Sequence, residues 1–406
     1  MAIRYTLSED KTIKDIESIY RDTTLKQDFY NETYGDDCSI KPYEQIADLI
    51  IKIFKPKKHM DIGCGKGLLV EAMISRDVKS YGIDFSEALI NAANPNILKY
   101  LSVGSTETFL QEVLSQDFDL ISYMEVFEHL PISILERTVK DLFAKFNGNL
   151  FFTIPSHGLD PTFNKGLFVD NGNWQWQRDM IANTPFRNIV LENGKPHCGH
   201  ITLASYRWWT EFFLFHGFLR NTDLEKKCLT YFNDIITRYK WKPYVLKKMK
   251  SLSRPITIKD PDFLGLGWHD YEDTLDCRWT DGHATIYYSD DKPKLPQNIL
   301  IHCSAPDVNI GMDTTLLITL DRLTIDNNYS FHWKPIAGTR PIELKNRGEL
   351  RDINAPFISY DEYSSADKPT TWRIKLLSPH FCPKKYGLSL DDRNLGIMVH
   401  SIMING

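Results

Sequence analysis

Residues 59–67 carry the first pattern that could do chemistry. The stretch His-Met-Asp-Ile-Gly-Cys-Gly-Lys-Gly is typical of a short buried strand that enters a glycine-rich turn, and a helix is expected from Leu68. Glycine has no Cβ atom and tolerates φ > 0, so such a turn lets the backbone approach a ligand closely. Because open α/β sheets bind ligands beyond the carboxyl ends of their strands, the turn predicts a ligand site at a sheet edge.

A carboxylate lies at a suitable distance from this turn. Residues 81–85 predict a second strand that ends in Asp84, about twenty residues beyond the first glycines. This spacing suits an acid that accepts both ribose hydroxyls of a nucleoside-containing cofactor. Two simpler interpretations stay open: the glycines form a plain turn, and Asp84 caps a helix that starts near Ser86.

The spacing of the glycines separates two kinds of cofactor. Dinucleotide sites favour Gly-x-Gly-x-x-Gly, whereas this turn is Gly-x-Gly-x-Gly, preceded by Asp61. It resembles motif I of class I S-adenosylmethionine-dependent methyltransferases, and the resemblance continues through residues 40–225. Residues 124–130, Met-Glu-Val-Phe-Glu-His-Leu, are similar to the signature that follows strand 4 in that family. Further strands are expected at residues 98–103, 118–123 and 150–155.

The resemblance implies an α/β Rossmann-like fold with a mostly parallel sheet, S-adenosyl-L-methionine as cofactor and S-adenosyl-L-homocysteine as product. In that family the glycines flank the methionine part of the cofactor, and the strand-2 acid, here Asp84, holds the ribose. Ser105 occupies the place where many relatives carry an acid near the adenine. The cofactor-binding residues expected on this basis are Asp61, Gly63, Cys64, Gly65, Gly67, Asp84, Phe85, Ser105, Met124 and Glu125.

Three side chains near the strand ends are candidates for catalysis. Methyl transfer from a sulfonium depends mainly on positioning, but a hydroxyl acceptor also needs a base, and histidine is the usual one. His157 follows the fifth strand and is the first candidate for this base, and His129 follows the fourth. Glu125 is expected to orient the substrate or the base. The alternatives are a structural, hydrogen-bonding role for His129 and a helix N-terminal acid for Glu125.

Two tryptophans and a third histidine are candidates for acceptor binding. Trp174 and Trp176 have the spacing of one strand face or of two loop residues, and their flat rings suit stacking on a sugar. Burial beneath a lid is the alternative. His200 orders the loop before the next helix or faces the acceptor. Residues 197–200, His-Cys-Gly-His, invite a metal site, but no second cluster completes four ligands, so we expect no protein-bound metal.

The composition bounds the class of protein. The chain has 406 residues, enough for two domains, and its formal net charge of −5 argues against a nucleic-acid-binding surface. The best candidate for a membrane span, residues 46–54, is too short, and the N-terminus lacks the apolar segment of a secretory signal. Seven cysteines are scattered without paired spacing, which is typical of a reducing compartment. We expect a cytoplasmic protein and leave open its peripheral attachment to the inner membrane face.

Changes of pattern along the chain predict three parts. Residues 1–225 are expected to form the methyltransferase domain. Within it, residues 1–45 act as a lid or pack on the sheet, and residues 156–200 form a substrate insertion. A helical linker is expected at residues 226–261. From residue 262 to 406, short β-rich runs alternate with turn residues, which favours an all-β sandwich or jelly roll.

Two short motifs place this last part in a context. Gly-Trp-His with Arg-Trp-Thr, and later Asp-Arg-Asn-Leu-Gly-Ile, resemble elements of a β-sandwich module that accompanies bacterial surface-polysaccharide biosynthesis proteins. The simpler interpretation is that Trp268, Trp279 and Arg393 are core and corner residues of the sandwich.

The two resemblances together imply a methyltransferase that O-methylates a sugar hydroxyl in bacterial surface-glycan biosynthesis, of the O-antigen or capsule type, and that terminates chain growth. Its expected partners are a saccharide or glycan acceptor and other polysaccharide-assembly proteins, with no nucleic acid. One alternative keeps the cofactor and changes the acceptor to a small metabolite, a lipid or a protein amine. In the other, the sandwich is a glycan-binding or assembly module and the methyltransferase domain is a scaffold. The oligomeric state is not predicted.

Overall fold

The computed structural model describes residues 5–21, 40–112, 118–160, 174–231, 242–249, 256–259, 263–290, 295–306, 315–344, 348–360 and 370–405. Contacts divide the chain into two compact units. The first comprises Met1–Lys248 and Asp326–Ser330, and the second comprises Met249–Ile325 and Phe331–Gly406.

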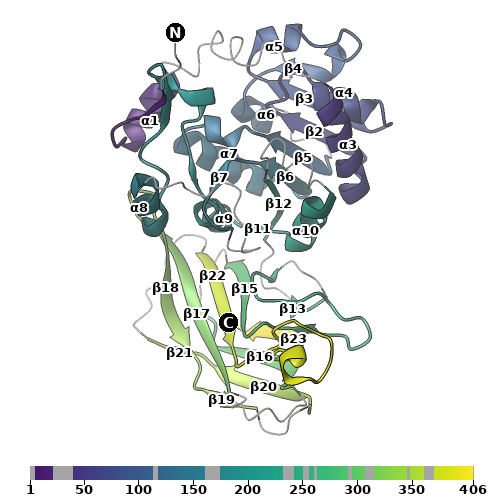
Figure 1. Ribbon diagram of the computed structural model, residues 1–406, viewed down its shortest axis with the longest axis vertical. Helices are drawn as coiled ribbons and strands as arrows, with labels where there is room; N and C mark the ends of the chain where they lie inside the picture. Colours follow the sequence, from purple (N-terminus) through teal and green to yellow (C-terminus); the bar gives the residue numbers. More distant parts are fainter. Residues whose placement is uncertain are drawn as a thin grey trace. The chain divides into compact units, whose positions relative to one another are not determined.

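The first unit is built on a seven-stranded sheet (Figure 1). In spatial order its strands are β11 (Phe218–Arg220), β12 (Pro243–Lys248), β6 (Asn149–Thr153), β5 (Leu120–Met124), β2 (Lys58–Ile62), β3 (Lys79–Asp84) and β4 (Leu101–Val103). The strands from β6 to β4 are parallel, and β12 pairs antiparallel with both β6 and β11. This mixed, mostly parallel sheet confirms the expected Rossmann-like fold.

The strand order changes direction between β2 and β5. The chain passes from β2 outward to β3 and β4, whereas β5 leads to β6 on the other side. At such a point the connections diverge and leave a crevice beyond the carboxyl ends of the strands. Ile121, Tyr123, Phe151 and Phe152 are fully buried, as expected for parallel strands covered on both faces.

Helices alternate with the strands. They are α3 (Lys41–Phe54), α4 (Leu68–Ile74), α5 (Glu87–Asn91), α6 (Thr106–Glu112), α7 (Ile132–Lys145), α9 (Tyr206–Phe215) and α10 (Thr222–Tyr231). Helix α3 shows why they pack. Ile46, Ala47 and Ile50 lie one turn apart on one face and are fully buried, in a cluster that includes Met73 of α4 and Val245 of β12.

The structure matches most of the expected strands and corrects part of the expected linker. The strands expected at 81–85, 98–103, 118–123 and 150–155 correspond to β3, β4, β5 and β6, and the helix expected from Leu68 is α4. In the helical linker expected at 226–261, the described residues are helical only at the start and include a strand. Within it α10 ends at Tyr231, and the apolar run Pro-Tyr-Val-Leu forms the start of β12, whose Tyr244 and Val245 are fully buried beside β6. A short apolar run of this kind fits a buried strand as well as a helix.

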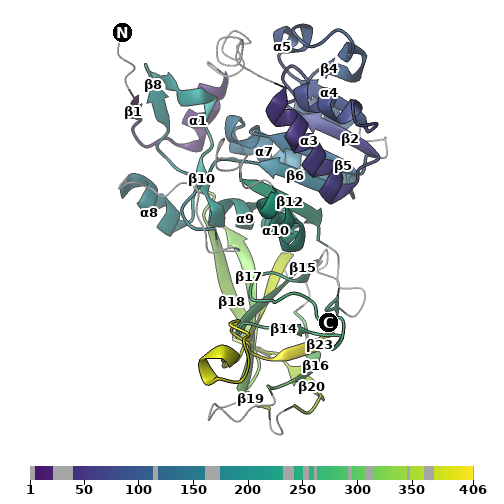
Figure 2. The ribbon, with the colours of Figure 1, turned by 45° about the vertical axis from the view of Figure 1, so that its right-hand side comes forward.

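The described parts of the 156–200 insertion, residues 156–160 and 174–200, form short elements, some of which pack with the N-terminal segment (Figure 2). Its described elements are β7 (Ser156–His157), α8 (Trp174–Ala182), β8 (Val190–Glu192), β9 (Lys195–Pro196) and the 3-10 turn η4 (His197–Gly199). Strand β1 (Tyr5–Leu7) pairs antiparallel with β8, and helix α1 (Ile13–Ile19) buries Ile16 against Ile189 and Ile201. The strand face expected for Trp174 and Trp176 is corrected, because both lie in helix α8.

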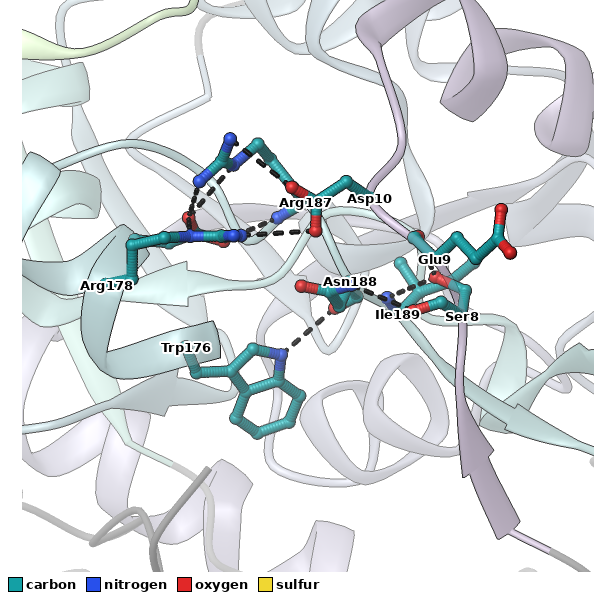
Figure 3. Close-up of polar contacts among 9 residues, drawn as sticks. Ser8, Glu9, Asp10, Trp176, Arg178, Arg187, Asn188 and Ile189 are labelled. Atoms are coloured by element: carbon teal, nitrogen blue, oxygen red, sulfur yellow. Dashed lines mark hydrogen bonds and ion pairs between the residues drawn. The ribbon is translucent and has the colours of Figure 1, made fainter. Parts of the chain in front are cut away.

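Polar contacts fasten the N-terminal segment to the insertion (Figure 3). The amide of Ile189 donates to Ser8 Oγ at 3.1 Å, and Asn188 Nδ2 donates to the Ser8 carbonyl at 2.8 Å. Arg178 and Arg187 both pair with Asp10, at 3.2 and 3.4 Å.

The same two arginines also bind Asp179, whose side chain is fully buried. Arg178 Nε donates to it at 3.0 Å, and Arg187 donates to it from both the backbone amide and Nη2, at 2.9 and 2.8 Å. The carboxylate therefore joins helix α8 to the segment that receives the N-terminal residues.

We expect Asp179→Asn to lower the free energy of unfolding of the first unit by about 2–3 kcal/mol, because it removes a buried anion and leaves two guanidinium groups without their buried partner. The matched control is Asp10→Asn. Its carboxylate is about half exposed, and we expect a change under about 1 kcal/mol. Urea titration of both variants measures the difference, and equal stabilities would contradict the structural role of Asp179.

The second unit is β-rich. A five-stranded sheet contains β13 (Ile256–Thr257), β14 (Arg278–Trp279), β16 (Asn298–Ser304), β20 (Arg351–Pro356) and β23 (Met398–Asn405). A six-stranded sheet contains β15 (His283–Asp290), β17 (Thr315–Ile325), β18 (Phe331–Gly338), β19 (Ile342–Glu343), β21 (Ile358–Ser359) and β22 (Thr370–Leu377). All these pairings are antiparallel, and residues of both sheets, such as Ile301 and Ile374, belong to one core cluster.

Among the described residues, no helix is both long enough and apolar enough to cross a membrane.

Candidate active site

A cavity of about 370 Å³ opens at the carboxyl ends of the strands of the first unit, where the strand order changes direction. Its walls come from the β2–α4 turn, the end of β3, the loops after β4 and β5, and η4. Two aromatic side chains from outside the sheet, Tyr20 and Tyr43, also line it. The cavity therefore lies where the sequence predicts a ligand site.

The glycine turn forms the floor of this cavity. Gly63 has φ +74°, and a Cβ atom there would lie 2.5 Å from Val126 Cγ2, so the loop after β5 packs directly on its backbone. Gly65 has φ +55°, and a Cβ atom there would meet no other atom within 4 Å. It would instead project into space beside the backbone. A turn with one face open in this way fits a ligand that lies along the chain.

Asp84 is held in a fixed orientation at the end of β3. Its Oδ2 accepts a hydrogen bond from the Gly65 amide and its Oδ1 one from the Ser86 amide, both at 2.8 Å. A carboxylate has about four acceptor positions, so each oxygen retains one for a ribose hydroxyl. Burial raises the pKa of Asp84, and the two amide donors lower it. Ser86, not Asp84, caps helix α5, by accepting from the Leu89 amide.

Asp61 belongs to a buried hydrogen-bond chain beneath the turn. Ser122 Oγ donates to Asp61 Oδ1 at 2.5 Å, and the same hydroxyl lies 2.9 Å from His59 Nε2. Burial and the neighbouring Asp84 raise the pKa of Asp61 to about 7, although the Ser122 bond opposes the shift. The chain fixes β2 against β5 and places a carboxyl group on the cavity wall.

Most of the predicted cofactor residues line the cavity. They include Asp61, Gly63, Cys64, Gly65, Asp84, Phe85, Ser105, Met124 and Glu125. Gly67 does not line it. It has φ +72° and begins helix α4, where a Cβ atom would meet Leu101 at 2.8 Å, so its role is packing. Ser105 exchanges hydrogen bonds with Thr108 at the start of α6, which leaves the adenine contact untested.

The loop after β5 brings a second set of polar groups to the cavity. Glu125 has φ +54°, an uncommon conformation for a residue with a side chain. Three residues later Glu128 is fully buried, and its Oε1 lies 3.9 Å from both His129 Nε2 and His200 Nε2. One ligand atom from each of these three residues can be chosen so that all lie within 4.8 Å of one another. We call Glu128, His129 and His200 the Glu-His-His cluster.

Backbone hydrogen bonds explain why residues 70 positions apart in the sequence meet here. The amides of Ile201 and Thr202 both donate to the carbonyl of Glu128, at 2.9 and 3.0 Å. Thr202 Oγ1 donates to the carbonyl of Leu130 at 2.7 Å. The segment after η4 is thus tied to the loop after β5.

The hydrogen bonds of His129 determine which nitrogen can bind a ligand. Its Nδ1 lies 3.2 Å from the Gly199 carbonyl oxygen, which can only accept a hydrogen bond. Nδ1 therefore donates to this carbonyl, and Nε2 lies 3.9 Å from Glu128 Oε1. Burial lowers the pKa of His129 to about 4 and that of His200 to about 3, so both imidazoles are neutral near pH 7.

The Glu-His-His cluster fits a divalent cation. Both carboxylate oxygens of Glu128, and Oε1 of Glu125, are buried, and the side chains of Glu125 and Glu128 interact with each other. Burial and the neighbouring Glu125 carboxylate raise the pKa of Glu128 well above its usual value, a shift that a cation beside the carboxylate would reverse. Two imidazoles and one carboxylate suit Mn²⁺, Fe²⁺ or Zn²⁺ better than Ca²⁺ or Mg²⁺. The prediction that the protein binds no metal stays a prediction, but the neighbours of His200 in this cluster come from the loop after β5 and not from Cys198.

We expect cation affinity to rise with pH. The raised pKa of Glu128 means that a cation competes with a proton for its carboxylate, whereas the histidines already lack their protons above about pH 4. Below the raised pKa of Glu128, the association constant for Mn²⁺ should increase with pH as this proton is released. Calorimetric titration in two buffers of different ionisation enthalpy counts this proton. An affinity independent of pH would contradict the raised pKa of Glu128.

The structure does not support the roles predicted for His157 and the tryptophans. The His157 ring packs against Trp176 and Phe186, with centroids at 4.7 and 5.2 Å, and burial lowers its pKa to about 4. It does not line the cavity among the described residues. Trp176 Nε1 donates to the Asn188 carbonyl, and Trp174 is largely exposed beside Arg178. His157 and Trp176 thus pack against each other and against Phe186, and neither tryptophan lines the cavity.

Two important residues were missed by sequence reasoning. Glu128 had a usable signal, since Glu-x-x-Glu-His places two acids and a histidine within one short loop. Tyr20, at the end of helix α1, had no such signal in the sequence. It reaches the cavity only because α1 packs on the insertion, where its ring is partly buried beside Ile189 and Ile201.

Comparisons with known proteins agree with this geometry. A family model described as "Methyltransferase domain" matches residues 40–212. The chain is similar to a ubiquinone biosynthesis O-methyltransferase of Coxiella burnetii, with 32% identity over 159 residues, 36% of this chain and 64% of the relative. It is also similar to the protein of the same name from Hahella chejuensis, with 28% identity over 139 residues, 31% of this chain and 58% of the relative. The chain thus spans less than two thirds of the length of these relatives.

Solved structures give partial matches. The chain is similar to a SAM-dependent methyltransferase from Archaeoglobus fulgidus, at 20% identity and a TM-score of 0.27, over 32% of this chain and 57% of that one. It is also similar to the magnesium protoporphyrin IX methyltransferase of Synechocystis, at 18% identity and a TM-score of 0.27, over 34% and 72%. The residues that match the methyltransferase-domain model, 40–212, include most of the residues that line the cavity.

Proposed function

We propose that this chain transfers a methyl group from S-adenosylmethionine to a hydroxyl oxygen, with the help of a divalent cation. One observation carries the proposal. His129 and His200 of the Glu-His-His cluster line the same cavity as the glycine turn and Asp84, and the buried carboxyl group of Glu128 lies 3.9 Å from both imidazoles. A buried carboxylate beside two neutral imidazoles is an unfavourable arrangement unless a cation or an acceptor completes it.

Each group in the cavity has a role in this reaction. S-adenosylmethionine supplies a methyl group already activated on a sulfonium, and a bound cation would supply Lewis-acid activation of the hydroxyl. Asp84 and the Gly63–Gly65 backbone bind and orient the cofactor. Glu125, which lines the cavity and has a buried Oε1, accepts the hydroxyl proton. Tyr20, Leu130 and Ile134 narrow the cavity and exclude water from it.

The acceptor we propose is a saccharide hydroxyl with a neighbouring hydroxyl that can also reach the cation. The support is the second unit, whose two antiparallel sheets around one core cluster accord with a β-sandwich or jelly roll, and whose motifs resemble a module of surface-polysaccharide proteins. Termination of a growing glycan, and association with polysaccharide-assembly proteins, would follow from such an acceptor. This support comes from the kind of protein in which such a module occurs and not from the residues of the cavity.

A second acceptor class is an aromatic compound with two adjacent hydroxyls. It is favoured by the relatives named ubiquinone biosynthesis O-methyltransferase and by the apolar side chains of Leu130 and Ile134 in the cavity. Such a compound would place one oxygen on the cation and present the other to the methyl group.

Methyl-labelled S-adenosylmethionine separates these possibilities. Purified protein with Mn²⁺ is mixed in parallel with fractionated surface polysaccharide, its lipid-linked precursors, aromatic ortho-diols, total protein and small metabolites, and Asp84→Ala serves as the blank. Label recovered as an O-methyl sugar supports the saccharide proposal, and label in the ortho-diol supports the second class. Label on protein amines only, or transfer unaffected by a chelator, would refute cation-assisted O-methylation.

A further inference from the structure

The loop formed by residues 384–390 in the second unit, Lys-Lys-Tyr-Gly-Leu-Ser-Leu, is exposed along its whole length. The exposed fractions are 50% for Tyr386, 52% for Leu388 and 91% for Leu390, the highest among the large apolar side chains of the described residues. Single exposed apolar residues are common on protein surfaces. Three within five positions are unusual and indicate a surface that is covered by something else.

The loop is held in place, so this exposure is a property of the fold. At its base, the amides of Phe381 and Leu395 donate to each other's carbonyls, at 2.9 and 2.7 Å. The amide of Lys384 donates to the Asp391 carbonyl at 2.8 Å, and the amide of Leu388 donates to the Pro383 carbonyl at 3.0 Å. In Figure 2 the yellow loop with its single helical turn stands out from the strands of this unit. A projecting tip can enter a soft surface without a complementary pocket.

The charges next to the apolar residues identify the partner. Lys384 and Lys385 are exposed, and residues 384–390 contain no acid. The first two acids after the loop are Asp391, which is paired with Arg393 at 2.7 Å, and Asp392, which is exposed. The loop is therefore locally basic in a chain whose net charge is −5. Lysines beside leucines and a tyrosine are the combination that favours an anionic lipid surface.

We propose that the second unit docks on an anionic lipid surface through the 384–390 loop. Leu388 and Leu390 enter the boundary of the acyl chains, Tyr386 lies at the level of the headgroups, and Lys384 and Lys385 contact lipid phosphates. This proposal is independent of the methyl-transfer reaction, because no residue of the loop lines the cavity of the first unit.

Vesicle sedimentation with the full chain tests it. Wild-type protein is expected to bind vesicles of phosphatidylcholine with phosphatidylserine and to bind pure phosphatidylcholine much less. The double variant Leu388→Ser with Leu390→Ser should lower the partition coefficient by about tenfold. Its control, Leu350→Ser, alters a leucine of the same unit that is 47% exposed and should change little. Lys384→Gln with Lys385→Gln should weaken binding by about fivefold per lysine, and Lys334→Gln is the control.

Three results would overturn the proposal. Wild-type protein does not sediment with the anionic vesicles, or the double leucine variant binds as well as wild type. The third result is that wild-type protein self-associates in sedimentation velocity, that the double leucine variant abolishes this association, and that no vesicle binding is seen. The last result would assign the loop to a second copy of the chain. Circular dichroism of each variant verifies that it is folded.

Discussion

Asp84→Ala is expected to weaken S-adenosylmethionine binding by at least about a hundredfold. The substitution removes a carboxylate that two backbone amides hold in position, and with it two charge-assisted hydrogen bonds to the ribose, each worth about 1.5–3 kcal/mol. Isothermal titration with S-adenosylhomocysteine measures the loss without any acceptor. Methyl transfer should fall at least as far, because the cofactor is no longer held against the glycine turn.

Asp119→Ala is a matched control for this variant. Asp119 also accepts two backbone amides, from Lys57 at 2.8 Å and Lys58 at 3.0 Å, but it does not line the cavity. Both variants lose the same kind of structural hydrogen bond, so only the loss of cofactor binding should differ. Equal affinities in the two variants would remove Asp84 from the cofactor site.

Glu128→Gln should abolish cation-dependent activity and leave cofactor binding intact. Glutamine keeps the volume of the side chain but not its charge, so the affinity for Mn²⁺ or Zn²⁺ is expected to fall by at least about a hundredfold. The carboxyl group is fully buried and lies 3.9 Å from both imidazoles. Titration of the cation, followed by titration of S-adenosylhomocysteine, separates the two effects.

Glu211→Gln provides the comparison for Glu128→Gln. Glu211 is another largely buried glutamate, in helix α9, and its Oε2 accepts from Asn183 Nδ2 at 2.7 Å outside the cavity. Its substitution should reduce stability and leave cation affinity unchanged. If wild-type protein binds neither Mn²⁺ nor Zn²⁺, or if Glu128→Gln retains full activity, the Glu-His-His cluster is structural.

The sequence was sufficient for the parts of the site that depend on neighbours in the chain. The glycine turn, Asp84 and the strands β2 to β6 each follow from a local pattern of burial or from a required backbone conformation. Gly63 and Gly65 have positive φ, which glycine adopts without strain, so the glycines in the sequence indicate the turn. These features can therefore be predicted from short stretches of sequence.

The Glu-His-His cluster and Tyr20 depend on contacts between distant segments. His200 reaches Glu128 because two amides of the following residues donate to one carbonyl, and backbone hydrogen bonds leave no mark in residue types. His157 was chosen for its place after a strand, but that strand end pairs with β10 (Ala204–Ser205) and carries the ring into an aromatic cluster. Tertiary packing, not position along the chain, decided which histidines face the cavity.

The backbone conformation of Glu125 opposes the stability of this domain. Left-handed φ is unfavourable by about 1–2 kcal/mol for a residue with a side chain, and glycine avoids this penalty. Part of the gain is offset because glycine increases the conformational entropy of the unfolded chain. Glu125→Gly should thus raise the free energy of unfolding by roughly 0.5–1 kcal/mol while removing the proton acceptor. Stability measured by chemical denaturation and activity measured by methyl transfer would move in opposite directions. In evolutionary terms, a descendant of this protein that no longer transferred a methyl group to an acceptor could carry glycine at position 125 and would gain stability.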